Sequence, residues 1–279
     1  MKQYGILAYP AKDSLSPVIH NAAFKALELD AQYGVYEIPE EKLAEFMKTV
    51  KHEPIDGLSV SLPYKESIIN FINKLGEDAE KIGAVNTINN KGGFLWGYNT
   101  DFIGAINTLK EAVDDLDEKT AVVLGAGGSA RAVIYGLLKE GAHVWIKNRT
   151  KEKADQIAME FAEMFGREVH SVSWEEKATG DILINATSFW VNYPKPEKLP
   201  AFCDQNFVDE FSVVMDISYN VKGFEDPLIT PLLKVARKLG KSVLTGDKML
   251  LYQAIEQFKI WTEKEPPVDV MRKSLDKAL

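Results

Sequence analysis

Short unbroken apolar runs alternate along this chain with longer stretches in which apolar residues recur at helical spacing. Such runs are typical of strands buried in a parallel sheet, whereas the recurrence indicates amphipathic helices, so the alternation predicts an α/β fold. The predicted strands cover residues 4–8, 32–38, 57–62, 121–124, 143–147, 182–185, 213–216 and 242–244, with strand-like runs at 83–88 and 97–101. The predicted helices cover residues 18–30, 40–50, 66–75, 102–113, 129–141, 151–165, 231–240 and 249–263.

A glycine turn joins one strand to its helix in the stretch TAVVLGAGGSARAV, residues 120–133. Gly125 allows a tight reversal, Gly127 lets backbone amides come close to a pyrophosphate, and Ala130 is small enough for helix and strand to pack. The positive end of the helix then faces the phosphates of a dinucleotide. Turns of this kind also close ordinary strand-helix units, so the stretch alone leaves both interpretations open.

The end of the next strand indicates which dinucleotide this turn would hold. Sites for NAD usually carry a carboxylate there for the ribose 2′-hydroxyl, but this chain has Asn148, Arg149 and Thr150. Arginine suits a 2′-phosphate through paired, charge-assisted hydrogen bonds. The sequence therefore favours NADP, with a solvated surface arginine as the alternative.

A well-marked helix start in the first half of the chain provides a candidate anion site. We expect Ser16 to be the N-cap and Pro17 the first helical residue. The hydroxyls of Ser14 and Ser16, beside free amides at the positive helix end, would bind a small carboxylate. Capping alone is the alternative explanation of Ser16, but it does not explain Ser14.

Three polar residues follow expected strand ends in the same half. Lys65 comes just after the strand at 57–62, on the rim where open α/β sheets bind ligands. A solvated surface lysine is the common alternative at such a position. Asn86 and Asp101 close the two strand-like runs, which predicts that both lie on the same rim.

Two connecting segments suggest the domain organisation. The acidic connector DDLDEK precedes the glycine strand, so we place a domain boundary near residue 103 or within the helix that begins there. Beyond it the pattern predicts doubly wound topology. Residues 188–209, with three prolines, are predicted to form a long irregular loop over a ligand cleft.

Composition limits the classes of function that need considering. With 46% hydrophobic and 27% charged residues among 279, the chain is typical of globular proteins, and its apolar runs are too short to span a membrane. The amino terminus lacks a signal peptide's apolar core, and the single Cys203 allows no internal disulfide, so we expect a cytoplasmic protein. A net charge of -8 without a basic run argues against nucleic acid as partner. Its four scattered histidines lack ligand spacing, so we expect no metal.

Eight short motifs, in order along nearly the whole chain, resemble those of the shikimate dehydrogenase family, which includes quinate dehydrogenases. They are Ser14-Leu-Ser16-Pro, Pro63-Tyr-Lys65-Glu66, Gly83-Ala-Val-Asn86-Thr87, Asn99-Thr-Asp101-Phe-Ile-Gly104, the glycine turn, Asn148-Arg149-Thr150, Asn185-Ala-Thr187-Ser188 and Met249-Leu-Leu-Tyr-Gln253-Ala. The resemblance implies a substrate-binding and catalytic domain of residues 1–103, completed by carboxy-terminal helices at about 250–279. It also implies a Rossmann-type doubly wound NADP domain of residues 104–249.

The resemblance also implies roles for individual residues. Lys65 and Asp101 match the catalytic pair, Ser14 and Ser16 would hold the substrate carboxylate, and Ser61, Asn86 and Gln253 would bind ring hydroxyls. The implied cofactor residues are Gly125, Ala126, Gly127, Gly128, Ser129, Ala130, Asn148, Arg149, Thr150, Thr187, Tyr219 and Gly246. The expected reaction is the reversible reduction of 3-dehydroshikimate to shikimate by NADPH, in aromatic amino acid (chorismate) biosynthesis, by a monomer or homodimer.

Several residues depart from the family pattern. Ser59 stands where the family usually has Asn, and Ser61 where it has Thr. The pair Phe189-Trp190 replaces a small residue and a glycine, and Asp247-Lys248 interrupts a Gly-x-Gly, so that a lysine could stand where backbone approaches the nicotinamide. These departures leave two alternatives, a quinate or amino-shikimate dehydrogenase and a non-catalytic nucleotide-binding regulatory protein.

Overall fold

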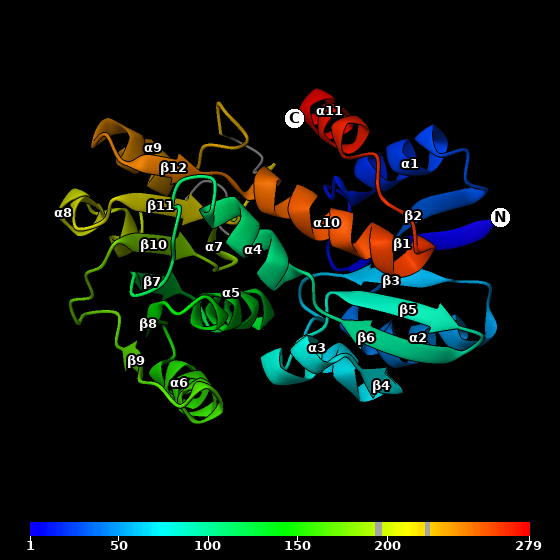
Figure 1. Cartoon of the computed structure of the whole chain (residues 1–279), viewed down its shortest axis with the longest axis horizontal. Coiled ribbons are helices and arrows are strands. Elements are labelled where there is room, and N and C mark those ends of the chain that lie inside the picture. The colour runs from blue at the N-terminus through cyan, green and yellow to red at the C-terminus, as the bar shows by residue number, and fades with distance from the viewer. Residues whose placement is uncertain (193–196, 221–223) are drawn as a thin grey trace. The chain divides into compact units, whose positions relative to one another are not determined.

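The computed structural model describes residues 1–192, 197–220 and 224–279, and its contacts divide the chain into two compact units (Figure 1). Unit 1 comprises Met1–Asp101 and Leu250–Leu279, and unit 2 comprises Phe102–Met249. Each unit contains a sheet with helices packed on it. The prediction of an α/β fold is therefore confirmed.

Unit 1 is built on a sheet that combines parallel and antiparallel strands. Its strand order is β2-β1-β3-β5-β6-β4, in which β1, β2 and β3 are parallel and β5 runs antiparallel to β3 and β6. Ser59 pairs with Thr87, so the amino end of β5 lies at the edge where β3 ends. The strands are β1 Lys2–Ala8, β2 Ala31–Glu37, β3 Gly57–Val60, β4 Lys74–Leu75, β5 Thr87–Lys91 and β6 Phe94–Tyr98.

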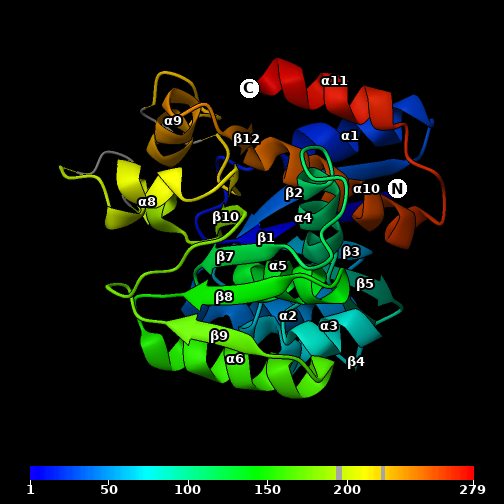
Figure 2. The ribbon, with the colours of Figure 1, turned by 60° about the vertical axis from the view of Figure 1, so that its left-hand side comes forward.

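The helices of unit 1 come from both ends of the chain. In Figure 1 and Figure 2, α1 and α11 lie side by side. Helical spacing puts Leu43, Met47 and Val50 of α2 on one face, which packs with Leu58 and Ile88 of the sheet in one buried cluster. The helices are α1 Ser16–Ala26, α2 Leu43–His52, α3 Glu77–Ile82, α10 Gly246–Thr262, which enters unit 1 at Leu250, and α11 Val268–Ala278.

Residues 66–75 differ from their prediction as one helix. They form a short 3-10 turn, Ser67–Phe71, followed by the two-residue strand β4. Asn73 explains the difference, because its backbone N–H donates to the Leu95 carbonyl (3.0 Å) and its side-chain oxygen accepts from the Leu95 N–H (2.9 Å). Pairing with the sheet therefore replaces the local helical hydrogen bonds that the apolar spacing suggested.

Unit 2 contains a parallel sheet with the strand order β12-β11-β10-β7-β8-β9. Taken from β7 along the chain, this is the 3-2-1-4-5-6 order of doubly wound dinucleotide-binding folds, with ligands bound where the order reverses, beside β7 and β10. Figure 2 shows β7, β8 and β9 running in one direction, with α6 along β9. The strands are β7 Thr120–Leu124, β8 His143–Lys147, β9 Val169–Val172, β10 Ile182–Asn185, β11 Val213–Asp216 and β12 Ser242–Leu244.

In chain order, the helices of unit 2 are α4 Asp101–Leu109, whose first residue belongs to unit 1, α5 Gly128–Lys139, α6 Lys151–Phe165, α7 Phe189–Asn192, α8 Gln205–Asp209 and α9 Pro231–Lys238. Of these, α5, α6 and α9 contact the strands of the sheet. The bounds of α6 and of strands β8, β10, β11 and β12 match their predictions. Strand β9 was not predicted, because His170 and Ser171 make it half-exposed and polar at its centre.

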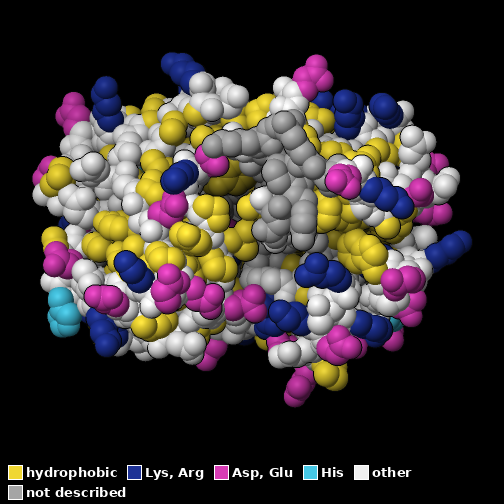
Figure 3. Space-filling view, turned by 180° about the vertical axis from the view of Figure 1, so that it is seen from behind, with side chains coloured by type: hydrophobic (Ala, Val, Ile, Leu, Met, Phe, Trp, Pro, Cys, Tyr) yellow, Lys and Arg dark blue, Asp and Glu magenta, His cyan; other side chains and the backbone are white. Residues whose placement is uncertain are grey.

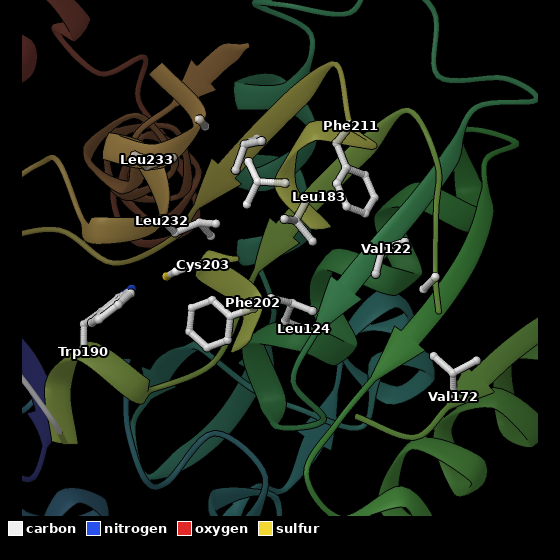
Figure 4. Close-up of a cluster of buried hydrophobic side chains, with 14 residues drawn as sticks. Val122, Leu124, Val172, Leu183, Trp190, Phe202, Cys203, Phe211, Leu232 and Leu233 are labelled. Carbon is white, nitrogen blue, oxygen red and sulfur yellow. The ribbon is translucent and has the colours of Figure 1, made fainter. Parts of the chain in front are cut away.

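In its described part, the segment 188–209 is not the wholly irregular loop that was predicted. It contains α7, a 3-10 turn at Ala201–Cys203 and α8, and the buried Trp190 and Phe202 pack edge to face with 5.7 Å between ring centroids (Figure 4). Burial of such rings is worth about 1.5–3 kcal/mol each, which favours a packed segment over an open loop. Cys203 belongs to the same cluster, and burial raises the pKa of its thiol. Pro194 and Pro196 lie outside the described residues.

The surface carries charges of both signs. Figure 3 shows Lys and Arg side chains interspersed with Asp and Glu over one face. Among the described residues, no helix is long and apolar enough to cross a membrane.

Candidate functional site

Lys65 and Asp101 form an ion pair in unit 1, with 2.6 Å between Nζ and Oδ2. Lys65 lies in the turn after β3, and Asp101 is the first residue of α4. Their side chains are only 13% and 6% exposed, so water screens this pair less than a surface pair. An ammonium carries three protons, so one that is held by a carboxylate can still donate to a ligand.

Asn86 connects this pair to the rest of unit 1. Its Nδ2 donates to Asp101 Oδ1 and to Thr100 Oγ1, both at 2.9 Å, and to Gln253 Oε1 at 3.4 Å. Its Oδ1 accepts from the Thr100 N–H (2.8 Å) and from Thr87 Oγ1 (2.7 Å). Asn86 precedes β5 instead of closing a strand, but the antiparallel direction of β5 still brings it to the predicted rim.

Asn99, which the sequence analysis placed in a motif but gave no role, is a neighbour of this cluster. Its Oδ1 accepts from the Asp101 N–H (3.0 Å), and its Nδ2 donates to the Ala84 carbonyl (2.9 Å). It therefore holds the amino end of α4 against the segment that carries Asn86. The available signal was the polar run from Asn99 to Asp101, directly after a strand.

Helix α1 begins differently from its prediction. Its N-cap is Leu15, and the N–H of the buried Ser16 donates to Ser14 Oγ at 3.3 Å. The prediction that Ser16 caps the helix is therefore wrong: the cap is one residue earlier, and the Ser14 hydroxyl accepts from the Ser16 amide. Ser14 and Ser16 lie between β1 and the first turn of α1, and Ser61 directly follows β3, where its N–H donates to the Leu7 carbonyl of β1 (2.9 Å).

The glycine turn of unit 2 allows a close approach of backbone. Gly125 has a φ of +115°, and a Cβ there would come within 3.1 Å of the Ala186 carbonyl oxygen. Gly127 is the N-cap of α5 and makes no side-chain cap, so no cap side chain covers this end of the helix. The turn thus fits a pyrophosphate, which needs backbone amides and no bulk.

The segment after β8 presents a cation beside a helix start. Asn148 Nδ2 donates to the Thr150 carbonyl (2.8 Å) and holds this turn, while Arg149 and Thr150 are exposed. Helix α6 begins at Lys151 without a side-chain cap. A guanidinium next to an uncapped, positive helix end suits a phosphate group.

Thr187, Tyr219 and Gly246 follow the carboxyl ends of β10, β11 and β12. Asn185 Oδ1 accepts from both the N–H and the Oγ1 of Thr187, at 3.1 and 2.7 Å. A Cβ on Gly246 would lie 2.2 Å from the Ile217 carbonyl oxygen, so only glycine fits there. These three predicted cofactor residues therefore share one edge of the sheet.

Asp216, at the end of β11, was missed by sequence reasoning although it joins these segments. Its Oδ2 accepts from Asn185 Nδ2 (3.0 Å), Trp190 Nε1 (2.8 Å) and Thr230 Oγ1 (2.8 Å), and its Oδ1 from the Ser218 N–H (3.0 Å). Burial raises the pKa of this carboxyl, and the four donors offset part of that shift. Trp190, a departure from the family pattern, is therefore a buried hydrogen-bond donor in the interior of unit 2.

Two other departures have partners within their own units. Ser59 Oγ accepts from the Tyr33 hydroxyl (2.6 Å) and donates to Gln257 Oε1 (2.7 Å). The Lys248 ammonium forms an ion pair with Glu111. Both side chains are therefore held by neighbours in the protein.

The chain is similar to known proteins along nearly its whole length. Residues 6–88 match the shikimate dehydrogenase substrate binding domain, residues 107–219 match the shikimate / quinate 5-dehydrogenase model, and residues 248–275 match the shikimate 5′-dehydrogenase C-terminal domain. A shikimate dehydrogenase (NADP(+)) of Methanocella arvoryzae is 39% identical over 282 residues, which cover 100% of both chains.

Two solved structures are similar over the whole chain. One is a shikimate dehydrogenase in complex with NADP+, with 38% identity, a TM-score of 0.90, and coverage of 100% of this chain and 96% of the other. The second is the enzyme of Thermus thermophilus in complex with NADP(H) and shikimate, with 34% identity, a TM-score of 0.84 and coverage of 100% of both chains.

Proposed function

The chain belongs to the shikimate dehydrogenase family, and we propose on this premise that it reversibly reduces the ketone of 3-dehydroshikimate to the hydroxyl of shikimate with NADPH. Similar proteins named for NADP(+), and a similar structure with NADP(H) and shikimate bound, support this assignment. The reaction would serve aromatic amino acid biosynthesis by way of chorismate. Unit 1 would bind the substrate and unit 2 the cofactor.

The observation that carries the proposal is the partly buried Lys65–Asp101 pair within the Asn86 cluster. NADPH, when bound, supplies the hydride. As the carbonyl carbon is reduced, negative charge grows on its oxygen, and the Lys65 ammonium stabilises this charge and donates the proton. Asp101 holds the ammonium in place, and Asn86 in turn holds the second oxygen of Asp101.

The remaining polar groups of the rim would bind the substrate. Ser14 and Ser16, at the positive end of α1, suit the substrate carboxylate. Ser61, Asn86 and Gln253 would bind ring hydroxyls; the contact between the last two supports a shared role.

The cofactor residues proposed for unit 2 form two groups. The glycine turn, Gly125, Ala126, Gly127, Gly128, Ser129 and Ala130, would hold the pyrophosphate, and Asn148, Arg149 and Thr150 would hold the 2′-phosphate. Thr187, Tyr219 and Gly246 would line the nicotinamide end. The close approach of backbone at Gly125 and Gly246 supports the placement of a flat ligand over this edge.

Replacing Lys65 by Met tests the proposal. We expect kcat for shikimate oxidation to fall by roughly 10²–10⁴ with a smaller change in KM, because the charge acts mainly in the transition state. Lys2→Met is the matched control, since it removes another lysine-aspartate pair of unit 1 whose lysine is 66% exposed. Near wild-type turnover by Lys65→Met would overturn the mechanism, and lack of turnover by the wild type would favour a regulatory protein.

Quinate is the second candidate substrate, because the family model that matches residues 107–219 is described for shikimate and quinate. Steady-state assays with shikimate, quinate and amino-shikimate, each with NADP and NAD, decide between them. We expect the highest kcat/KM for shikimate with NADP.

We also propose that the enzyme works in the cytoplasm as a monomer or homodimer. The single, buried Cys203 supports a protein that needs no disulfide.

A further inference from the structure

Three buried polar side chains form a hydrogen-bonded chain beside the Asn86 cluster of unit 1. The Tyr33 hydroxyl on β2 donates to Ser59 Oγ on β3 (2.6 Å), which donates to Gln257 Oε1 on α10 (2.7 Å). Their exposed fractions are 2%, 5% and 1%. We refer to them as the Tyr33–Ser59–Gln257 chain, and the function proposed above uses none of the three.

The Tyr33–Ser59–Gln257 chain ends on the backbone of Asn86. Gln257 Nε2 donates to the Asn86 carbonyl oxygen at 3.1 Å, and the Val60 N–H donates to the same oxygen at 2.7 Å. The side chain of Asn86 is bonded to Asp101, which holds Lys65. A continuous set of hydrogen bonds therefore leads from the interior of unit 1 to the reacting ammonium.

Helix α10 contacts Asn86 at two points one turn apart. Gln253 Oε1 accepts from the Asn86 side chain at 3.4 Å, while Gln257 donates to its backbone. The Asn86 carbonyl can only accept, so Nε2 of Gln257 faces it, and the Ser59 hydroxyl donates to Oε1 on the other side of the amide. Loss of either member would leave a buried polar group without its partner and free the peptide to shift.

We propose that Gln257 and Ser59 are positioning residues for the catalytic pair. Through the Asn86 peptide they hold the Asn86 amide at the point where it orients Asp101 and Lys65. This inference rests on the proposed dehydrogenase function. It assigns a role in turnover to residues that touch neither the substrate nor the cofactor.

Replacement of Gln257 by Glu tests the inference. The change keeps the shape and the acceptor for Ser59, but it puts an oxygen opposite the Asn86 carbonyl. Asn89→Asp is the matched control, because Asn89 Nδ2 makes the same kind of bond to α10, at 3.2 Å to the Ile260 carbonyl, without contact to the catalytic pair. Ser59→Ala and Gln257→Met remove the same link without adding charge, so the test stands even where Gln257→Glu does not fold.

We expect the Gln257 and Ser59 variants to lose roughly 10–100-fold in kcat with less than a threefold change in KM, the size of effect that small misplacements produce. The primary isotope effect with shikimate deuterated at the reacting carbon should rise, because hydride transfer becomes slower. Asn89→Asp should keep the wild-type kcat and isotope effect, even where it lowers Tm as much as the Gln257 and Ser59 variants do.

Two results would overturn the inference. One is turnover by the Gln257 and Ser59 variants within about twofold of an active wild type. The other is a loss of kcat in Asn89→Asp as large as that in the Gln257 and Ser59 variants, at the same Tm as those variants. An inactive wild type would instead refute the proposed function, which separates the two failures.

Discussion

His20 lies fully buried in an aromatic cluster of unit 1, and this environment makes stability depend on pH. Its ring stacks on Tyr33 with 4.7 Å between centroids and an interplanar angle of 12°, and Trp261 lies at 5.1 Å. Neither ring nitrogen has a hydrogen-bond partner among the described residues. Burial lowers the pKa of His20 from 6.5 to about 3.

The sign of the effect follows from proton linkage. Between pH 6.5 and 3 the unfolded chain binds a proton at His20 whereas the folded chain does not, so stability falls as the pH falls through this window. Each pH unit costs about 1.4 kcal/mol, which gives about 2 kcal/mol at pH 5 relative to pH 7.5. At pH 5 the folded histidine is still neutral, so the loss of about 2 kcal/mol depends on the pKa of His20 in the unfolded chain and not on how far its folded pKa is lowered.

Urea unfolding of the wild type and of His20→Phe at pH 7.5 and pH 5 measures this contribution. We expect the variant to lose about 2 kcal/mol less than the wild type between the two pH values. Other titrating groups act in both proteins and cancel, as does any pH-independent cost of fitting phenylalanine. His20→Leu should show the same reduced pH dependence. An identical pH dependence in the wild type and both variants would refute a neutral, buried His20.

Two further predictions concern unit 2. Arg149→Ala should weaken NADP binding by roughly 1.5–3 kcal/mol and barely change NAD binding, because the guanidinium would contact only the 2′-phosphate. Calorimetry measures both affinities, and equal losses for the two cofactors would show that Arg149 is not in the 2′-phosphate site. Trp190→Phe keeps an aromatic ring but removes the donor to Asp216, so unfolding free energy should fall by about 1–3 kcal/mol, whereas unchanged stability would show that this hydrogen bond is dispensable.

Local sequence patterns were sufficient to predict an element wherever the residues that form the pattern also make the contacts that stabilise the element. The apolar run before Gly125 predicted a buried strand, and the glycines predicted a tight turn that the φ of +115° and the nearby Ala186 carbonyl bear out. The bounds of α6 were predicted from its apolar spacing. In these cases the backbone hydrogen bonds and the buried face belong to neighbouring residues, so the order of residues determines the structure.

Contacts between distant residues decided the rest. Asn73 pairs with Leu95, so sheet pairing takes the place of a predicted helix. Trp190 donates to the buried Asp216, so its part of a predicted loop lies in the core. Asn86 was recognised as a candidate, but its hydrogen-bond partners were not. They are Asp101, Gln253 and Gln257, which lie 15 to 171 residues away in the sequence. The sequence by itself determined which residue types were available at the rim of the sheet. Only the tertiary structure decided which donors meet which acceptors, because buried polar groups must find partners wherever the packed chain provides them.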